Sequence, residues 1–310
     1  MTRAVVAPSY GGPEVLTIVD VDPGRPGPGQ VLLEVRAAGV NPADWKTYSG
    51  VWGTDPARLP LRLGFEATGV VVDAGPGDHG VRVGDEVLTP ADGAYADRVL
   101  VRAADVVAKP PSLDWAAAGG LLLTGATAAH TVEATGVAAG DTVLVHGASG
   151  GVGAMVVQLV LERGARVIGT ARRSRLDAVA ELGAVPVEYG PGLADRVRAL
   201  APDGVQAAVD TAGTDEALDV SVELVADRAR VATIAAFARG GELGIQVLGN
   251  GPGADPGTAV RAAARPRLAE LAGTGRLRVR VAATFPLADV AEAHRLGMAG
   301  GATGKIVLLP

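Results

Sequence analysis

Four glycines within seven residues place the strongest constraint on this chain. The run Gly147-Ala148-Ser149-Gly150-Gly151-Val152-Gly153 follows the apolar segment Val143-Leu144-Val145 and precedes another at residues 154–161. A turn without bulky side chains folds tightly between strand and helix and lets a pyrophosphate approach its backbone, while the helix N-terminus faces the phosphates. The pattern predicts a dinucleotide-binding turn, with cofactor contacts at Gly147, Ser149, Gly150, Gly151, Val152 and Gly153.

The same run also satisfies the G-x-S-x-G motif, in which a serine nucleophile sits between a strand and a helix. A hydrolase built on Ser149 would need an acid and then a histidine further along the chain, and the one histidine after it is His294. The residues around His294 predict an amphipathic surface helix. We therefore favour the dinucleotide turn and keep a serine hydrolase as the remote alternative.

Apolar strand-like runs alternate with helical segments on both sides of this turn, over residues 142–248. Such alternation implies a parallel sheet that is covered on both faces and wound right-handedly. The expected strands are 142–146, 166–170, 185–189, 207–211 and 230–234, and the expected helices are 152–163, 175–182, 193–200 and 216–226.

The segments near the two ends of the chain predict a different arrangement of secondary structure. Up to about residue 110, Gly/Pro turns separate short strands, and Ser112 is expected to cap a helix that starts at Leu113. The C-terminal tail can complete this β domain. We expect an α/β protein with a β domain from residues 1–118 and 256–310 and a dinucleotide-binding domain from 119–255. The expected terminal strands are 31–37, 69–73, 86–88, 98–101, 277–283 and 305–309, with helices at 258–272 and 287–298.

The residues after the second strand of the parallel sheet indicate which dinucleotide binds. An acid there would hold a free ribose 2'-hydroxyl, whereas this chain has Thr170-Ala171-Arg172-Arg173-Ser174-Arg175, with three arginines and no acid. Guanidinium contacts to a 2'-phosphate contribute about 1.5 to 3 kcal/mol each. A solvated helix start is disfavoured, because cations are unfavourable at a helix N-terminus. The sequence predicts NADPH, with contacts from Thr170, Arg172, Arg173, Ser174 and Arg175 and, in the loops after the fourth and fifth strands, from Thr211, Ala212, Ala235, Ala236 and Phe237.

Composition excludes several mechanisms and partners. The chain of 310 residues, long enough for two domains, has no cysteine, so disulfides, thiolate nucleophiles and cysteine-ligated metals are absent. A net charge of -6 would repel nucleic acid. No apolar run reaches the roughly 18 residues that a bilayer span needs, so we expect a cytoplasmic enzyme without a membrane partner. His79, His130 and His146 show no metal spacing, and His146 is expected to pack under the glycine turn.

Seven motifs resemble, in their order and spacing along the chain, those of the medium-chain dehydrogenase/reductases. Within that family they resemble the zinc-independent, zeta-crystallin-like quinone oxidoreductase branch. The resemblance implies a GroES-like β domain formed by both termini, a central Rossmann domain, catalysis in the cleft between them, and a homodimer. The motifs are the glycine turn, Gly39-Val40-Asn41-Pro42-Ala43-Asp44, Gly64-Phe65-Glu66-Ala67-Thr68-Gly69, Val83-Gly84-Asp85-Glu86-Val87, Gly93-Ala94-Tyr95-Ala96, Leu123-Thr124-Gly125-Ala126-Thr127-Ala128 and Thr303-Gly304-Lys305-Ile306-Val307-Leu308.

The chain departs from the zinc-dependent members of that family. Where they carry a catalytic cysteine and a histidine, it has Asn41 and Phe65, and their structural zinc lobe is missing. No metal site is therefore expected, and without a Lewis acid to polarise an alcohol, alcohol dehydrogenation is disfavoured. The remaining expectation is hydride transfer from NADPH to a conjugated acceptor, either a quinone or the β-carbon of an enone or enoyl thioester. The alternative is a catalytically idle NADPH-binding sensor or partner protein.

The resemblance also implies catalytic residues. Asn41 and Thr127 would lie near the nicotinamide, and Asp44 would order the loop that carries Asn41. Tyr48 is our candidate for hydrogen bonding to the acceptor carbonyl and for donating the proton. Lys305 is left open between a cofactor contact and a surface charge. The aromatic side chains expected to stack on a flat acceptor are Trp45, Trp52, Phe65 and Phe237, with a local hydrophobic cluster as the alternative for the first two.

Overall fold

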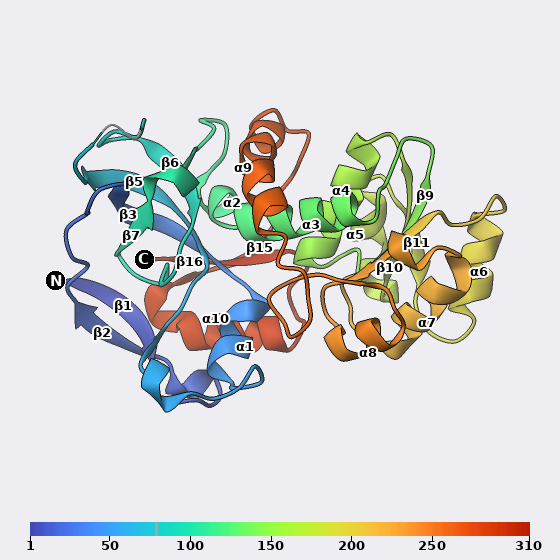
Figure 1. The fold of residues 1–310 in the computed structure, drawn as a ribbon, viewed down its shortest axis with the longest axis horizontal. Helices are drawn as coiled ribbons and strands as arrows, with labels where there is room; N and C mark the ends of the chain where they lie inside the picture. Colours follow the sequence, from blue (N-terminus) through green and yellow to red (C-terminus); the bar gives the residue numbers. More distant parts are fainter. Residues whose placement is uncertain (78–79) are drawn as a thin grey trace. The chain divides into compact units, whose positions relative to one another are not determined.

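The computed structural model describes residues 1–77 and 80–310. The chain divides into two compact units. Unit 1 contains Met1–Leu123, Arg265–Gly275 and Val279–Pro310, and unit 2 contains Thr124–Ala264 and Arg276–Arg278. Unit 1 therefore joins the two ends of the chain, and Figure 1 shows its C-terminal strands, in red, among the blue N-terminal ones.

Unit 1 is built around the long strand β3 (Gln30–Val40). This strand pairs antiparallel with β5 (Glu66–Ala74), with β7 (Arg98–Arg102) and with the C-terminal strand β16 (Lys305–Leu309). Its buried side chains belong to the hydrophobic core of the unit. The other strands of unit 1 are β1 (Thr2–Ala7), β2 (Thr17–Val21), β4 (Leu61–Arg62), β6 (Glu86–Pro90), β8 (Val107–Ala108) and β15 (Val281–Pro286).

The strands of unit 1 form two sheets. One is a three-stranded sheet in the order β2-β1-β4, and the other is a seven-stranded sheet in the order β15-β16-β3-β5-β6-β8, with β7 also on β3. The helices of the unit are α1 (Pro42–Tyr48), α2 (Trp115–Gly119) and α10 (Val290–Met298), and short 3-10 turns occur at Pro13–Val15, Pro56–Arg58, Ala103–Asp105 and Leu287–Asp289.

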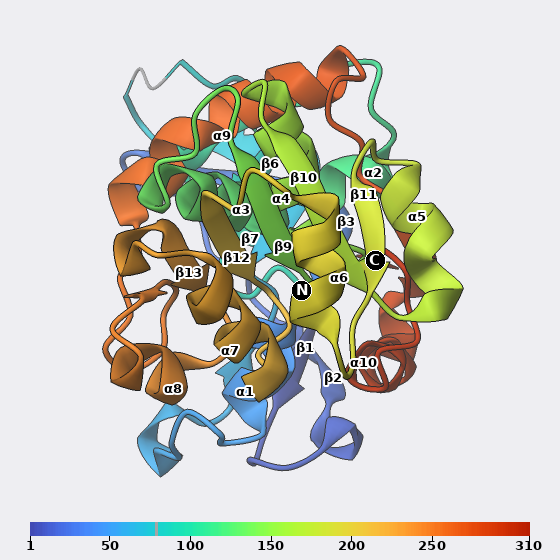
Figure 2. The same cartoon turned by 90° about the vertical axis from the view of Figure 1, so that its right-hand side faces the viewer.

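Unit 2 contains a six-stranded parallel sheet in the order β11-β10-β9-β12-β13-β14. In chain order this is 3-2-1-4-5-6, the doubly wound arrangement that binds dinucleotides where the order reverses, here between β9 and β12. Figure 2 shows five of these strands, β11, β10, β9, β12 and β13, side by side. The expected doubly wound sheet is thus confirmed. The strands are β9 (Thr142–His146), β10 (Arg166–Ala171), β11 (Val185–Glu188), β12 (Ala207–Asp210), β13 (Val231–Thr233) and β14 (Gln246–Val247).

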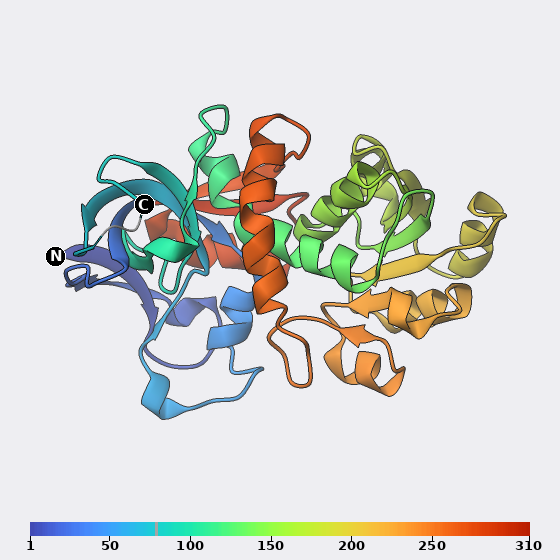
Figure 3. The same cartoon turned by 45° about the horizontal axis from the view of Figure 1, so that its top comes forward.

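The connections between these strands supply the covering helices of unit 2. The helices are α4 (Gly151–Glu162), α5 (Leu176–Ala180), α6 (Leu193–Leu200), α7 (Asp215–Leu224) and α8 (Phe237–Glu242), with 3-10 turns at Arg173–Arg175 and Arg228–Arg230. Two helices continue across the division between the units: α3 (Leu122–Ala134) and α9 (Thr258–Gly273), which is one unbroken helix in Figure 3. In the part of the chain that the structure describes, no helix is both long and apolar enough to cross a membrane.

Several local expectations are corrected by the structure. Ser112 does not cap a helix: Asp114 caps α2 by accepting from the Ala117 N–H at 2.7 Å, whereas the Ser112 hydroxyl donates to the Gly273 carbonyl. The strand expected at 277–283 begins only at Val281. Helices α1, α3 and α8 were not expected, and neither was the two-residue strand β14.

Candidate active site

The glycine turn of unit 2 has the geometry of an anion cradle. Gly147 adopts φ +72°, and a Cβ there would lie 2.7 Å from the Thr211 hydroxyl. A Cβ on Gly153 would lie 2.1 Å from the Gly147 carbonyl oxygen, so α4 packs this closely against the turn only because Gly153 lacks a side chain. Gly150 is the N-cap of α4, which places the first N–H groups of this helix beside the turn. The cradle fits a dinucleotide pyrophosphate.

The second strand of the sheet ends at the arginine cluster. Arg172, Arg173 and Ser174 are exposed, and Arg175 is half-buried. Burial and the neighbouring charge of Arg172 lower the pKa of Arg175, which indicates that these two cations lie close together. Two adjacent guanidinium groups fit a doubly charged phosphate. Thr170, at the end of β10, is buried and accepts a hydrogen bond from the Gly147 N–H.

An acid does approach this cluster, although none is present in the sequence segment itself. Glu188 ends the neighbouring strand β11, where it is paired in register with Ala171, and its carboxylate binds Arg173 at 3.0 Å. The pair is largely exposed, so it contributes little to stability. Glu188 partly neutralises the charge of Arg173, whereas Arg172 and Arg175 lie close to each other.

The loops after β12 and β13 approach each other closely. Thr211 donates its hydroxyl to the His146 carbonyl at 2.7 Å. A Cβ on Gly213 would lie 2.8 Å from the Ala235 Cβ, so the two loops are in contact. Ala212 is exposed, and Ala235, Ala236 and Phe237 are half-buried.

Three predicted residues of unit 2 have distinct surroundings: Phe237, Thr127 and Ser149. The ring of Phe237 is covered by a glycine loop, because a Cβ on Gly251 would come within 2.4 Å of it. Thr127 lies in α3 and is 9% exposed. Ser149 is half-buried in the glycine turn. The remote alternative of a serine hydrolase is not supported. Its candidate base would be His294, and both ring nitrogens of His294 are bonded to tyrosines in unit 1.

A buried ionic network lies at the start of α1 in unit 1. The Lys305 ammonium bonds to Glu66 Oε1 at 2.9 Å, to Asn41 Oδ1 at 2.6 Å and to the Val40 carbonyl at 3.2 Å. Both charged side chains are nearly inaccessible, with exposed fractions of 4% and 2%. The surface-charge alternative for Lys305 is therefore wrong. All three ammonium hydrogens are used, so a direct cofactor contact by this nitrogen would require one of these bonds to break.

The side chain of Asn41 is held by the same network. Its amide nitrogen donates to Glu66 Oε1 at 3.0 Å and to the Gly39 carbonyl at 3.1 Å. The other Glu66 oxygen accepts from the Leu123 N–H at 2.8 Å, at the start of α3. Glu66 thus connects Asn41 to the first turn of another helix. Its motif was recognised in the sequence, but its role as the centre of the network was not.

Asp44 orders the loop around Asn41. One carboxylate oxygen accepts from the Asn41 N–H at 2.8 Å, and the other accepts from the Gly64 N–H at 3.0 Å. Asp44 is completely buried. Burial raises the pKa of its carboxyl to about 7, although hydrogen bonds from Tyr95, Asn41 and Gly64 and the charge of Lys305 act in the opposite direction.

A hydrogen-bonded chain of aromatic side chains continues from Asp44. Tyr95 bonds to the Asp44 carboxylate, and its hydroxyl lies 3.3 Å from His294 Nε2. The other ring nitrogen, Nδ1, lies 2.9 Å from the Tyr48 hydroxyl. His294 is completely buried on the inner face of the expected amphipathic helix α10, and burial lowers its pKa to about 4.

Tyr48 is also completely buried, and its ring stacks on His294. Its hydroxyl is turned toward the core of the unit, so direct contact with an acceptor carbonyl would require the side chain to leave this position. Trp45 packs its edge against the same histidine, with ring centroids 5.8 Å apart, whereas Trp52 is 40% exposed and Phe65 is half-buried. Trp45 and Tyr48 therefore belong to one cluster around His294.

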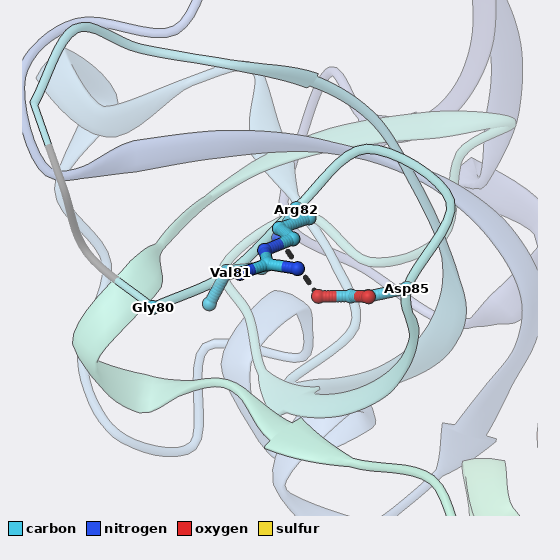
Figure 4. A pocket seen from close by; sticks show the side chains of 4 residues that line it. All are labelled: Gly80, Val81, Arg82 and Asp85. Carbon is cyan, nitrogen blue, oxygen red and sulfur yellow. Dashed lines mark hydrogen bonds between the residues drawn. The ribbon is translucent and has the colours of Figure 1, made fainter.

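Other possible sites carry no comparable chemistry. Among residues 1–77 and 80–310, no group of three or more His, Cys, Asp and Glu side chains could hold a metal ion, and His79 lies outside these ranges. A pocket of about 310 Å³ is lined by Gly80, Val81, Arg82 and Asp85 (Figure 4). There the Asp85 carboxylate accepts from the Arg82 N–H at 2.7 Å, which is a turn-closing bond.

The reversed strand order, the glycine cradle and the arginine cluster define a dinucleotide-binding protein. Comparisons with known proteins agree with this class. Residues 27–112 match the family model described as alcohol dehydrogenase GroES-like domain, which confirms the expected fold of the β domain, and residues 182–308 match the one described as zinc-binding dehydrogenase.

Two curated relatives match this chain over its full length. A 2-haloacrylate reductase from Burkholderia sp is 33% identical over 100% of this chain and 99% of its own. A quinone oxidoreductase from Pseudomonas aeruginosa is 31% identical over 100% of both. Among solved structures, a mycobacterial protein complexed with NADPH has a TM-score of 0.86 at 30% identity, with 100% of both chains covered. The chain belongs to the medium-chain dehydrogenase/reductase superfamily, in its quinone oxidoreductase branch, and is an oxidoreductase of that type.

Proposed function

We propose that this protein uses NADPH to reduce a conjugated acceptor, either a quinone or an α,β-unsaturated carbonyl compound. The observation that carries the proposal is the position of Arg172 and Arg175 at the end of β10, next to the glycine cradle, in a chain similar to a 2-haloacrylate reductase and to a quinone oxidoreductase. When bound, NADPH would supply the hydride. The acceptor would also take up a proton.

The residues of unit 2 would hold the cofactor. The glycine turn would bind the pyrophosphate, Arg172 and Arg175 the 2'-phosphate, and the loops at Thr211–Ala212 and Ala235–Ala236 the nicotinamide half. Unit 1 would supply the acceptor side. We place Asn41 and Thr127 near the nicotinamide, and Trp45, Trp52, Phe65 and Phe237 around the acceptor.

The geometry changes the proposed roles of two residues. Because the Tyr48 hydroxyl bonds to a buried histidine, we assign Tyr48 to positioning α1 instead of to direct proton donation. Because the Lys305 ammonium bonds to Asn41 and Glu66, we assign Lys305 to fixing the Asn41 amide. A homodimer and a cytoplasmic location complete the proposal, and light scattering of the purified protein would test the dimer.

Turnover with a panel of acceptors tests the function. The loss of NADPH absorbance should accompany reduction of 2-chloroacrylate, a simple enone or a benzoquinone, whereas a saturated ketone should give no reaction. Fluorescence titration should show tighter binding of NADPH than of NADH. Tight NADPH binding without turnover of any acceptor would favour an idle sensor, and absence of NADPH binding would overturn the proposal.

A further inference from the structure

Four polar side chains form a row across the parallel sheet of unit 2. His146, Asp210 and Thr233 are register neighbours at the carboxyl ends of β9, β12 and β13. Thr170 of β10 lies beside His146, one position past the register pair of Gly169 and Val145. Side chains at aligned positions of parallel strands point to the same face of a sheet. All four are buried, with exposed fractions of 1%, 0%, 0% and 2%. A polar row inside a sheet core is costly unless its members have partners.

The partners of this row are the backbones of the three loops that follow the strands. The Thr170 hydroxyl accepts from the Gly147 N–H at 3.3 Å, in the glycine turn. Asp210 Oδ1 accepts from the N–H groups of Ala212 and Gly213, each at 2.9 Å. The row therefore anchors loops that the strand order places against a dinucleotide.

Thr233 anchors the third loop and is itself held by Asp210. Its hydroxyl accepts from the N–H groups of Ala235 at 3.2 Å and Ala236 at 3.1 Å. The same hydroxyl donates to Asp210 Oδ2 at 2.7 Å. One buried carboxylate thus fixes its own loop directly and the next loop through the threonine.

His146 lies between Thr170 and Asp210 in this row. Its Nδ1 lies 3.4 Å from the Thr170 hydroxyl, and its Nε2 is the one side-chain nitrogen of the row for which the described residues provide no hydrogen-bond partner. Burial lowers the pKa of this imidazole to about 4, and the charge of Asp210 acts against that shift. At neutral pH the ring is therefore uncharged.

We propose that Asp210 and Thr233 are positioning residues for the nicotinamide half of the cofactor, acting through the loops that they anchor. This inference rests on the proposed use of NADPH. The strand order reverses between β9 and β12, so a dinucleotide that crosses this point has its adenosine 2'-phosphate half on the β10 side and its nicotinamide half on the β12 and β13 side. Residues that anchor the loops after β12 and β13 should therefore affect binding of the complete dinucleotide and not binding of its adenosine half.

The test compares Thr233→Val with Thr233→Ser. Valine keeps the size of the side chain and removes the hydroxyl, and serine keeps the hydroxyl. The control is Thr68→Val in unit 1, where an equally buried threonine donates to the Val87 carbonyl at 2.6 Å. Two ligands are titrated by calorimetry against each variant: NADPH and adenosine 2',5'-bisphosphate.

We expect Thr233→Val to raise the Kd for NADPH by roughly tenfold, because two loop N–H groups lose their acceptor. Its Kd for adenosine 2',5'-bisphosphate should stay within about twofold of wild type, as should the KM for the acceptor at saturating NADPH. Thr233→Ser should recover most of the NADPH affinity, and Thr68→Val should change neither Kd.

The outcomes separate this inference from the proposed function. If Thr233→Val binds NADPH as tightly as wild type does, or loses both ligands equally, the positioning role is wrong. If Thr233→Val does not fold, Asp210→Asn is titrated in its place and should show the same selective loss of NADPH. If the wild-type protein itself binds neither ligand, the proposed function fails, and this inference fails with it.

Discussion

The Lys305 ammonium nitrogen lies 2.9 Å from Glu66 Oε1, although the two residues are 239 positions apart in the chain. Both are buried, and the same pair holds Asn41 and the first turn of α3. A buried ion pair of this kind is costly to break from one side, because the remaining charge stays in a medium of low polarity. This relationship gives the first prediction.

Removing either charge alone should destabilise the protein strongly. Lys305→Met and Glu66→Gln should each lower the free energy of unfolding, the first by about 3 to 5 kcal/mol, whereas the double variant should recover much of that loss. Urea unfolding measures all three. The control is Glu188→Gln at the exposed pair with Arg173, which should leave the free energy of unfolding almost unchanged. Strictly additive effects of the two buried changes would contradict the pairing.

Tyr48→Phe tests whether this hydroxyl donates the catalytic proton. Since the hydroxyl faces His294 in the core, its loss should lower the free energy of unfolding by about 1 kcal/mol and leave kcat for an enone within about threefold of wild type. Steady-state kinetics at saturating NADPH provide the measurement. A fall in kcat of a hundredfold or more, in a folded variant, would restore the role of direct proton donor.

His294 should make the protein sensitive to acid. Its folded pKa of about 4 lies below the ordinary value of 6.5, so the neutral ring stabilises the fold above pH 6.5, and this contribution is lost as the pH falls toward 4. The stability of wild type relative to His294→Gln should fall by about 3 kcal/mol between pH 7.5 and pH 4. Urea unfolding of both proteins at each pH gives the difference, and a difference independent of pH would refute the shift.

The contribution of Asp44 to stability should depend on pH in the opposite direction to that of His294. Burial raises its pKa from 3.8 to about 7, so its contribution is fully present below pH 3.8 and is lost as the pH rises through 7. Asp44→Asn cannot ionise and should therefore gain stability relative to wild type as the pH rises from about 4 to 8, by up to roughly 4 kcal/mol. The same unfolding series measures this. A relative loss over that interval would show that its hydrogen-bond donors outweigh its burial.

The arginine cluster should determine the choice between cofactors. Replacing both Arg172 and Arg175 with alanine should raise the Kd for NADPH by roughly a hundredfold and leave that for NADH almost unchanged, because two charge-assisted bonds to the 2'-phosphate are lost. Arg173→Ala should have a smaller effect, since Glu188 already holds this guanidinium. Fluorescence titration with both dinucleotides is the measurement, and an equal loss for NADH would locate the cluster elsewhere than at the 2'-phosphate.

Local patterns in the sequence were sufficient for the parallel sheet and the glycine turn. Strand β9 has the bounds expected for it, 142–146, and the helix expected at 193–200 also has those bounds in the structure. Apolar periodicity and turn residues act over a few positions, so they can be recognised without knowing the fold. Short helices such as α1 and α8 were not predicted from the sequence, because they span only about two turns and depend on packing.

Four features follow from the residue order alone: the glycine cradle, the order of strands and helices around it, the absence of cysteine, and an arginine cluster where an acid would hold the ribose. The partners of the buried and charged side chains depend on the fold: Lys305 beside Glu66, His294 beside Tyr48, and Glu188 beside Arg173. Each pair joins segments that lie on different strands or helices. Their hydrogen bonds and charges depend on distances of a few ångströms, which are set when the elements pack together and not by the spacing of residues along the chain.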